Sequence, residues 1–272
     1  SYCIQGFGIM TDQMNRPVAI VTGGRRGIGL GIATALAKAG YDIAVTGIGI
    51  GIGDAVSAQE TLSFLRSQGG DALYLHADLS DVASHEATVK AILERFGKID
   101  CLVNNAGIAS VVRGDFLALE PSNFDTIIDT NLKGTVFFTQ AVVKAMLAIA
   151  EPLHARSIIN ITSVSAQSSS PERLDYCISK AGLAAFSQGL ALRLAETGIA
   201  VFEVRPGIIR TDMTAAVTSK YDSLIANGLV PMRRWGQAED IGDICAALAS
   251  GSFAFATGSV IDADGGLSIP RL

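Results

Sequence analysis

Short apolar runs alternate with longer stretches of helical spacing along most of the chain. Seven short runs are rich in β-favouring side chains and predict buried strands; they span 18–22, 42–46, 72–76, 99–103, 157–162, 199–205 and 259–262. Between them, apolar positions recur every three or four residues and predict helices, in the stretch ending at Gly40, in 55–67, 81–96 and 239–249, from Pro121 onward, and around Tyr176. Strands that alternate with helices predict an α/β fold with a doubly wound, seven-stranded parallel sheet and helices on both faces.

Four polar or glycine-rich segments directly follow predicted strands. They are the glycine loop at 23–29, Asn-Asn-Ala-Gly at 104–107, Ser163, and Pro206-Gly207. In doubly wound sheets, ligands bind outside the carboxyl ends of the strands, near the point where the strand order reverses. We therefore expect these segments to share one rim and to form a binding site there.

The 272 residues contain nothing that resembles a linker, so residues 17–272 are expected to form a single domain. Residues 1–16 show no clear period and lack the basic start and apolar core of a secretory signal; we expect a loosely ordered leader, with Met10 or Met14 as a candidate true start. Residues 211–236 are neither clean helix nor strand. Their apolar positions suit a lid over a substrate pocket or an ordinary packed helix pair.

Composition narrows the classes of function. The net charge of −5 and the absence of a basic run argue against a nucleic-acid partner. The four cysteines are widely spaced, which argues against a disulfide framework or a zinc site and favours a reducing cytoplasm. No apolar stretch approaches the ~20 residues of a membrane helix. Since the three histidines lack the spacing of metal ligands, metal catalysis is not expected.

The first predicted strand runs directly into Gly-Gly-Arg-Arg-Gly-Ile-Gly and then into a helix. Because the first amides of a helix lack internal partners, this arrangement can cradle a phosphate. Gly23, Gly27 and Gly29 are where a side chain would block the turn or the approach of a pyrophosphate. The spacing differs from the usual dinucleotide motif, and the Lys-Ser/Thr of nucleotide hydrolases is missing after Gly29. A glycine-rich turn without a ligand remains the alternative.

The end of the second strand bears on the choice of cofactor. An acidic residue there receives the adenosine ribose of NAD and repels the 2′-phosphate of NADP. Gly47 occupies this position, and Arg25 and Arg26 lie in the glycine loop, which favours NADP. NAD remains the alternative, since Asp54 follows shortly after. After the third strand, Asp78 would either accept the adenine amino group or cap the following helix.

The candidate chemistry lies in Ser163–Lys180. Tyr176 and Lys180 stand four residues apart, so they would project from one face of a helix. A cation beside a phenol favours the phenolate and lowers a pKa that is ordinarily about 10. Ser163 could bring a hydroxyl to the same place, which suits proton transfer to or from an alcohol or carbonyl oxygen, although Tyr-x-x-x-Lys also arises by chance on helices. Asn131 precedes Gly134 inside a predicted helix, and such a conflict with propensity often marks a functional or closely packed place.

Taken together, these motifs resemble the short-chain dehydrogenase/reductase family over 17–272, which implies a Rossmann-type fold. The shared features are the loop at 22–29, Asn-Asn-Ala-Gly, Asn131, Ser163, Tyr-Cys-Ile-Ser-Lys, Pro206-Gly207 with Thr211, and the terminal Asp-Gly-Gly. The resemblance implies that Tyr176 is the general acid/base, Lys180 holds the nicotinamide ribose and lowers the phenol pKa, Ser163 polarises the carbonyl, and Asn131 supports a water in a proton relay. The expected cofactor-binding residues are Thr22, Gly23, Arg25, Arg26, Gly27, Ile28, Gly29, Gly47, Asp78, Leu79, Asn105, Ala106, Gly107, Tyr176, Lys180, Pro206, Gly207, Ile209 and Thr211.

Within the family, the chain looks most like the 3-oxoacyl-(acyl-carrier-protein) reductases of fatty acid biosynthesis. It departs from them in Gly-Ile-Gly-Ile-Gly-Ile-Gly at 47–53 and in the segment at 113–120. The expected reaction is NADPH-dependent reduction of a ketone, in a small molecule or an acyl thioester, to a secondary alcohol. The alternatives are an NAD(H)-dependent sugar or polyol dehydrogenase and a non-catalytic dinucleotide-binding redox sensor. The resemblance also implies a homotetramer, with 182–194 and 253–262 as contacts.

Overall fold

The computed structural model describes residues 16–49, 52–211, 214 and 218–271. Of the predicted leader, only Arg16 falls within these ranges, and its guanidinium lies 3.1 Å from the carboxylate of Asp42. The remainder of the leader lies outside the described residues.

All seven predicted strands are present and form one parallel sheet in the order β3-β2-β1-β4-β5-β6-β7. Their bounds are β1 Val18–Thr22, β2 Asp42–Gly47, β3 Ala72–His76, β4 Cys101–Asn104, β5 Arg156–Ile161, β6 Ile199–Pro206 and β7 Val260–Ala263. The strand order reverses between β1 and β4, which confirms the predicted doubly wound topology. The fourth strand starts two residues later than predicted, and just before it the carboxylate of Asp100 accepts a hydrogen bond from the backbone N of Val18 at 2.8 Å.

Helices occupy the connections between the strands. Their bounds are α2 Gly27–Lys38, α3 Ile52–Ser67, α4 His85–Phe96, α5 Pro121–Ile128, α6 Thr135–Leu147, α7 Leu174–Leu194, α8 Thr218–Ala226 and α9 Ala238–Ala249. The helix predicted over 81–96 begins with a 3-10 turn at Val82–Ser84 and continues as α4. The helix predicted from Pro121 is interrupted by a π-helical turn, Asp129–Gly134, between α5 and α6.

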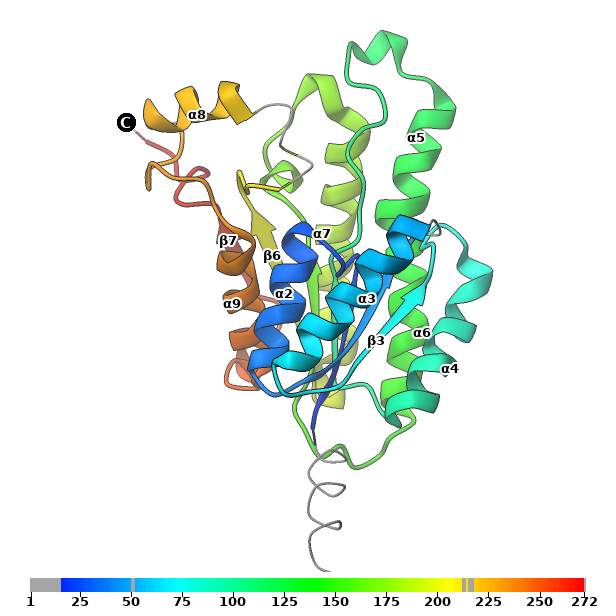
Figure 1. The fold of residues 1–272 in the computed structure, drawn as a ribbon. Helices are drawn as coiled ribbons and strands as arrows, with labels where there is room; N and C mark the ends of the chain where they lie inside the picture. The colour runs from blue at the N-terminus through cyan, green and yellow to red at the C-terminus, as the bar shows by residue number, and fades with distance from the viewer. Residues whose placement is uncertain (1–15, 50–51, 212–213, 215–217, 272) are drawn as a thin grey trace, which may run out of the picture.

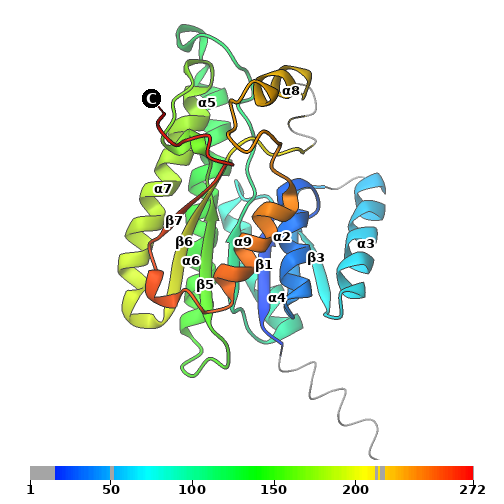
Figure 2. The ribbon, with the colours of Figure 1, turned by 90° about the vertical axis from the view of Figure 1, so that its left-hand side faces the viewer.

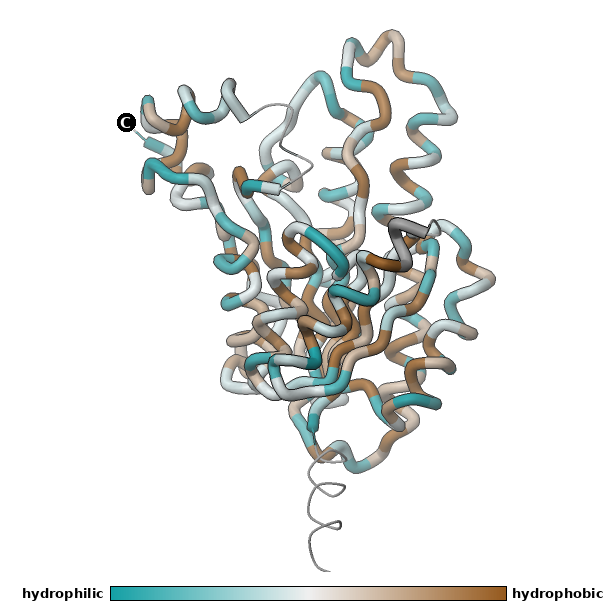
Figure 3. Tube along the Cα trace, viewed as in Figure 1, coloured by the Kyte–Doolittle hydropathy of each residue, from teal (hydrophilic) through white to brown (hydrophobic). Residues whose placement is uncertain are grey.

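Two apolar clusters fix these helices on opposite faces of the sheet. The first joins α2, α3 and α9 to one face, with Leu36, Leu65 and Ile241 fully buried in it. The second joins α4, α6 and α7 to the other face, with Ile92 and Phe138 fully buried. Each such side chain contributes about 1.5–3 kcal/mol of transfer free energy. Figures 1 and 2 show the resulting three layers, and apolar positions concentrate where the strands lie (Figure 3).

Helices α5 and α8 stand beyond the carboxyl ends of the strands (Figure 1). Segment 211–236, for which both a lid and a packed helix pair were predicted, contains one described helix, α8. Ile225 of this helix packs with Val230 and Trp235 in a small cluster of its own. The segment therefore has its own apolar support above the edge of the sheet.

No helix within the described ranges is long and apolar enough to span a membrane.

Candidate active site

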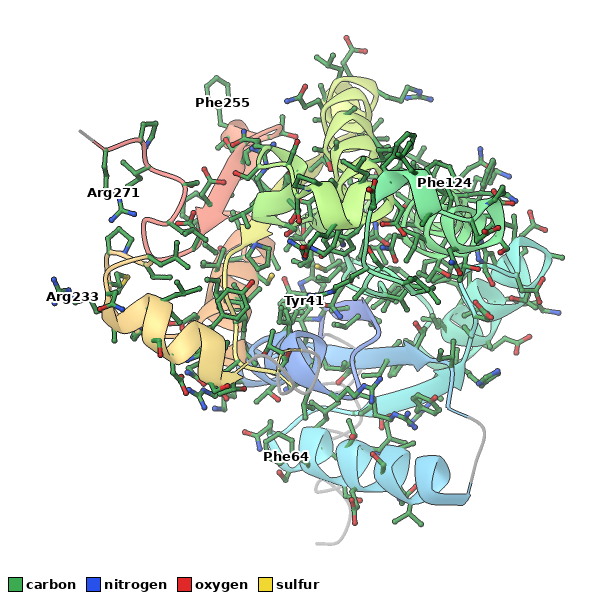
Figure 4. The ribbon with its side chains drawn as sticks, turned by 90° about the horizontal axis from the view of Figure 1, so that it is seen from above. Tyr41, Phe64, Phe124, Arg233, Phe255 and Arg271 are labelled. Carbon is green, nitrogen blue, oxygen red and sulfur yellow. The ribbon has the colours of Figure 1, made fainter. Side chains whose placement is uncertain are left out.

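The four segments that follow strands do share one edge of the sheet. They continue β1, β4, β5 and β6, which are consecutive in the sheet order. Seen from above, α8 lies on one side of this edge and α5, marked by Phe124, on the other (Figure 4). The predicted common rim is therefore confirmed.

The glycine loop is shaped by backbone conformations that side chains would obstruct. Gly23 and Gly27 have φ values of +64° and +53°, in the left-handed region where glycine avoids strain. A Cβ at Gly29 would overlap the carbonyl oxygen of Gly23 and would lie 2.6 Å from Nδ2 of Asn105. Helix α2 begins at Gly27, and no side chain caps its first amides at Arg26. These amides and the helix dipole fit an anion, so the residues present suit the pyrophosphate of a dinucleotide.

Thr22 and Asn105 bind the glycine loop to the neighbouring strand end. The Thr22 hydroxyl accepts hydrogen bonds from the backbone N of Asn105 and of Ala106, both at 3.0 Å. The Asn105 side chain donates to the carbonyl of Thr22 at 2.9 Å and to that of Gly23 at 3.3 Å. Both residues were predicted to bind cofactor, and in the structure their polar groups hold the two loops together.

Asn104, the first residue of Asn-Asn-Ala-Gly, is also a structural residue. Its amide donates to Thr139 Oγ1 at 2.8 Å and to Asn160 Oδ1 at 2.7 Å, in a buried polar network. Sequence analysis missed this role, because nothing in the motif distinguishes a buried amide from one that faces a ligand.

Asn131 lies in the π-helical turn and faces the same edge. Its Oδ1 accepts from the backbone N of Ile108 at 2.8 Å, and its Nδ2 donates to the carbonyl of Ile108 at 2.9 Å and to Ser179 Oγ at 3.3 Å. A Cβ at Gly134 would overlap the carbonyl oxygen of Leu79. The predicted conflict with helix propensity thus marks a closely packed place, where a π-helical turn separates α5 from α6.

Helix α7 brings Tyr176, Lys180 and Ser163 together. Tyr176 lies in the first turn of α7 and Lys180 one turn later, with Nζ 5.8 Å from the centre of the Tyr176 ring. Lys180 is 5% exposed, and its ammonium group donates to the carbonyl of Ile161, at the end of β5, at 3.1 Å. The hydroxyl of Ser163, which follows β5 closely, accepts from the backbone N of Ser165 at 3.1 Å and is near enough to the Tyr176 hydroxyl to lower the pKa of that phenol. Asn131 is adjacent, since a Cβ at Gly107 would lie 3.2 Å from its Oδ1 and 3.5 Å from Lys180 Nζ.

The expected lowering of the phenol pKa by Lys180 is not the dominant effect at Tyr176. The pKa of Tyr176 is raised, because burial outweighs the opposing effects of the Ser163 hydroxyl and of the positive charges of Arg173 and Arg113. Burial also lowers the pKa of Lys180 to about 8. The Lys180 ammonium group donates its hydrogen bond to the Ile161 carbonyl. Desolvation is the largest cause of the pKa shifts of both Tyr176 and Lys180.

Two further side chains adjoin Tyr176. Asp175 is 2% exposed, and its Oδ1 accepts from the Ser110 hydroxyl at 2.6 Å and from the backbone N of Tyr176 at 2.7 Å. The Arg173 guanidinium lies over the Tyr176 ring, 5.6 Å from its centre. Sequence analysis missed the Ser110–Asp175 bond, which ties the segment after Asn-Asn-Ala-Gly to the start of α7. The only signal was an acidic residue directly before the tyrosine.

Of the two roles left open for Asp78, the structure bears on the helix cap. Its exposed carboxylate accepts from the backbone N and the hydroxyl of Ser80 at 2.9 and 2.8 Å. The following 3-10 turn and helix α4 have no side-chain cap. The capping alternative is therefore wrong, and Leu79 next to it is buried, 4% exposed.

Gly47 is the last residue of β2, as the cofactor prediction requires. Arg25 is half-buried and Arg26 exposed in the adjoining loop. The Arg25 guanidinium lies 5.9 Å from the centre of the Tyr74 ring on β3. The side chain of Asp54, named as the residue that could favour NAD, lies outside the described residues.

The segment after β6 completes the edge. Thr211 approaches the glycine loop, since a Cβ at Gly27 would lie 3.5 Å from its Cγ2. A Cβ at Gly207 would lie 2.6 Å from Cβ of Asp264, so this glycine permits close packing against the end of β7. Ile209 was predicted to bind cofactor, but it is 4% exposed and packs in the apolar cluster with α9.

Comparison with known proteins agrees with this geometry. A family model described as enoyl-(acyl carrier protein) reductase matches residues 23–268. A crystal structure of a 3-oxoacyl-(acyl-carrier protein) reductase from Brucella melitensis in complex with NAD is 64% identical, covers 94% of this chain and 99% of that chain, and superimposes with a TM-score of 0.90. Another structure of such a reductase from the same organism is 62% identical over the same shares, with a TM-score of 0.88.

A more distant relative is the 3-oxoacyl-(acyl-carrier-protein) reductase FabG of Staphylococcus aureus. It is 34% identical over 250 residues, which cover 92% of this chain and 97% of the relative. With the parallel sheet, the glycine loop and the tyrosine, serine and lysine in place, the chain belongs to the short-chain dehydrogenase/reductase family of NAD(P)-dependent oxidoreductases, which act on carbonyl or CH–OH groups.

Proposed function

We propose that the chain reduces the ketone of a 3-oxoacyl thioester to a secondary alcohol with NADPH. The observation that carries this proposal is the meeting of Tyr176, Ser163 and Lys180 at the carboxyl edge that also carries the glycine loop. When bound, the nicotinamide supplies the hydride. The neighbouring hydroxyls of Ser163 and Tyr176 are placed to hold a carbonyl oxygen between two donors.

The raised pKa of Tyr176 suits the direction of reduction. A phenol that stays protonated at neutral pH can donate its proton to the oxygen as negative charge develops there. Lys180, held at the end of β5, is placed to bind the nicotinamide ribose. Asn131, locked to the backbone of Ile108, would support a water that returns a proton to the phenol.

The preference for NADPH rests on charge at the end of β2. Gly47 offers no carboxylate to repel a 2′-phosphate, and Arg25 and Arg26 lie in the adjoining loop. The Brucella relative with bound NAD makes this a point for direct measurement. Fluorescence titration with both reduced cofactors should give a lower dissociation constant for NADPH, whereas tighter binding of NADH would contradict the cofactor proposal.

The substrate proposal comes from the relatives named as 3-oxoacyl-(acyl-carrier-protein) reductases. A panel of acyl-thioester, sugar and cyclic ketones with each cofactor tests it. The highest kcat/KM should belong to a 3-oxoacyl thioester with NADPH. A higher value for a sugar or polyol with NAD(H) would favour the alternative dehydrogenase, and tight cofactor binding without turnover would favour a redox sensor.

We also propose a cytoplasmic homotetramer that uses α7 and the segment before β7. Leu192 on α7 is 82% exposed, and Phe255 projects from the body of the chain, fully exposed (Figure 4). Exposed apolar side chains of this size often mark a protein interface. Light scattering should give four times the mass of the chain, and a monomeric mass would contradict the proposal.

The segment 211–236 is proposed as a substrate lid, since α8 stands beyond the carboxyl ends of the strands (Figure 1), the edge to which the catalytic residues belong. The lid would change its exposure to protease when cofactor and substrate bind.

A further inference from the structure

The hydroxyl of Tyr74 is one of several buried polar groups that lack a hydrogen-bond partner among the described residues. Tyr74 lies on β3, and its ring packs against the apolar cluster that joins α2 and α3 to the sheet. Its Oη is buried and has no hydrogen-bond partner among the described residues. By contrast, the buried Tyr41 donates its hydroxyl to the carbonyl of Ala249 at 2.8 Å. Since an unmade buried hydrogen bond costs stability, the hydroxyl of Tyr74 has an unused donor for which the described residues supply no acceptor.

This hydroxyl lies at the end of β2. A Cβ at Gly47 would be 3.4 Å from Tyr74 Oη, so the phenol occupies the space beside the position where a side chain would meet the adenosine ribose. Arg25 comes to the same place from the glycine loop, with its guanidinium 5.9 Å from the centre of the Tyr74 ring. Three segments far apart in the sequence thus bring together a hydroxyl donor, a cation and a glycine.

A neutral donor beside a guanidinium suits a phosphate monoester better than a ribose hydroxyl. The hydrogen bond from a phenol to a charged phosphate oxygen is about twice as strong as one to a neutral oxygen. The cation adds attraction for the phosphate and none for an uncharged hydroxyl.

We propose that Tyr74 is a specificity-determining residue that donates its hydroxyl proton to the 2′-phosphate of NADPH. This assignment rests on the proposed NADPH preference and adds to it a group that lies outside the glycine loop. Gly47 contributes to the same preference, because it leaves out a carboxylate that would repel the phosphate.

The alternative role for Tyr74 is to support Arg25 with its ring alone. Tyr74→Phe separates the two roles, because phenylalanine keeps the ring and removes only the hydroxyl. Tyr41→Phe is the matched control, since it removes a buried hydroxyl that has a partner and lies away from the glycine loop. Both variants are compared with wild type in two measurements.

The first measurement is the thermal midpoint without cofactor. Tyr74→Phe should raise it, because an unpaired buried hydroxyl is removed, and Tyr41→Phe should lower it, because a carbonyl loses its donor. A lower midpoint for Tyr74→Phe would show that the hydroxyl already has a partner within the protein, which would overturn the proposal.

The second measurement is equilibrium binding of NADPH, NADH, 2′,5′-ADP and 5′-AMP by titration. Tyr74→Phe should raise the dissociation constants for NADPH and 2′,5′-ADP by about 10- to 100-fold, the range for a hydrogen bond to a charged group. It should change the dissociation constants for NADH and 5′-AMP far less. Tyr41→Phe should leave the ratio of the two cofactors unchanged. Unchanged binding of 2′,5′-ADP, or equal losses for 2′,5′-ADP and 5′-AMP, would overturn the assignment.

The adenosine fragments keep the two proposals separate. Tighter binding of NADH than NADPH by wild type would contradict the proposed cofactor. The effect of Tyr74→Phe on 2′,5′-ADP would still decide the role of the hydroxyl.

Discussion

Replacing Lys180 with methionine should make the chain more stable while it removes turnover. Burial lowers the pKa of Lys180 from 10.5 to about 8. At about 1.4 kcal/mol per pKa unit, this shift corresponds to a cost of about 3 kcal/mol for keeping the ammonium group inside the folded chain at neutral pH. Methionine avoids this cost and loses the hydrogen bond to the Ile161 carbonyl, worth about 1.5 kcal/mol or more for a charged donor. The expected net gain in the free energy of unfolding is at most about 1.5 kcal/mol.

The same shift predicts how the gain depends on pH. Between pH 8 and 10.5 the unfolded chain binds more protons at this position than the folded chain, so the stability of wild type rises with pH through this window. Methionine does not titrate, and the advantage of Lys180→Met should therefore be full at pH 7 and nearly gone at pH 10.5.

Urea denaturation without cofactor, at pH 7 and pH 10 and at one protein concentration, measures both effects. The control is Lys133→Met, because Lys133 is exposed and pairs with Asp129 at 3.1 Å; its loss should change stability by less than about 1 kcal/mol at either pH. If Lys180→Met is less stable than wild type at pH 7, or if its advantage does not shrink at pH 10, burial is not what governs this lysine.

Three further substitutions test the geometry. Gly29→Ala should abolish cofactor binding in a titration, because its Cβ would overlap a carbonyl oxygen of the glycine loop. The control Gly189→Ala, with open space around it, should bind cofactor normally and gain up to about 1 kcal/mol in the free energy of unfolding. Normal cofactor binding by Gly29→Ala would refute the proposed phosphate cradle. Ser163→Ala should lower kcat by about 100- to 1,000-fold and raise the pKa of Tyr176 further, which moves the alkaline limb of the pH–rate profile for reduction upward; a downward shift would contradict this. Gly47→Asp should reverse the cofactor preference in paired titrations. An unchanged ratio of the dissociation constants for NADPH and NADH would show that the end of β2 does not set the preference.

The layers of the fold were predictable because burial dominates them. Strand β1 is buried along its whole length, so its sequence carries an uninterrupted apolar run that is easy to recognise. The common edge was predictable for a related reason, since parallel strands bring their carboxyl ends together wherever a loop follows them. Glycines 23, 27 and 29 then marked the places where a side chain would strain the backbone or clash with it.

The direction of the pKa shift of Tyr176 was not predictable from spacing. Tyr-x-x-x-Lys implies proximity, but the balance between charge and burial depends on what surrounds both groups. The structure directs the Lys180 ammonium group to a backbone carbonyl and buries the phenol, and both effects come from segments distant in the sequence.

The polar contacts that support the site were also missed. Thr22, Asn105 and Asn104 all carry side chains that suit a ligand, and each uses them to join neighbouring loops or strands. Pairings across 35 to 84 positions depend on the sheet order, which residue types alone do not encode. The π turn around Asn131 left only a weak signal, an asparagine and a glycine in a helix.

The central claim is that Tyr176 gives its proton to the carbonyl oxygen, and Tyr176→Phe tests it most directly. With a 3-oxoacyl thioester and NADPH, single-turnover oxidation of the cofactor should slow by at least about 100-fold, while the dissociation constant for NADPH stays within about threefold of wild type, since the ring and its neighbours remain. Oxidation at the wild-type rate by this variant would contradict the account.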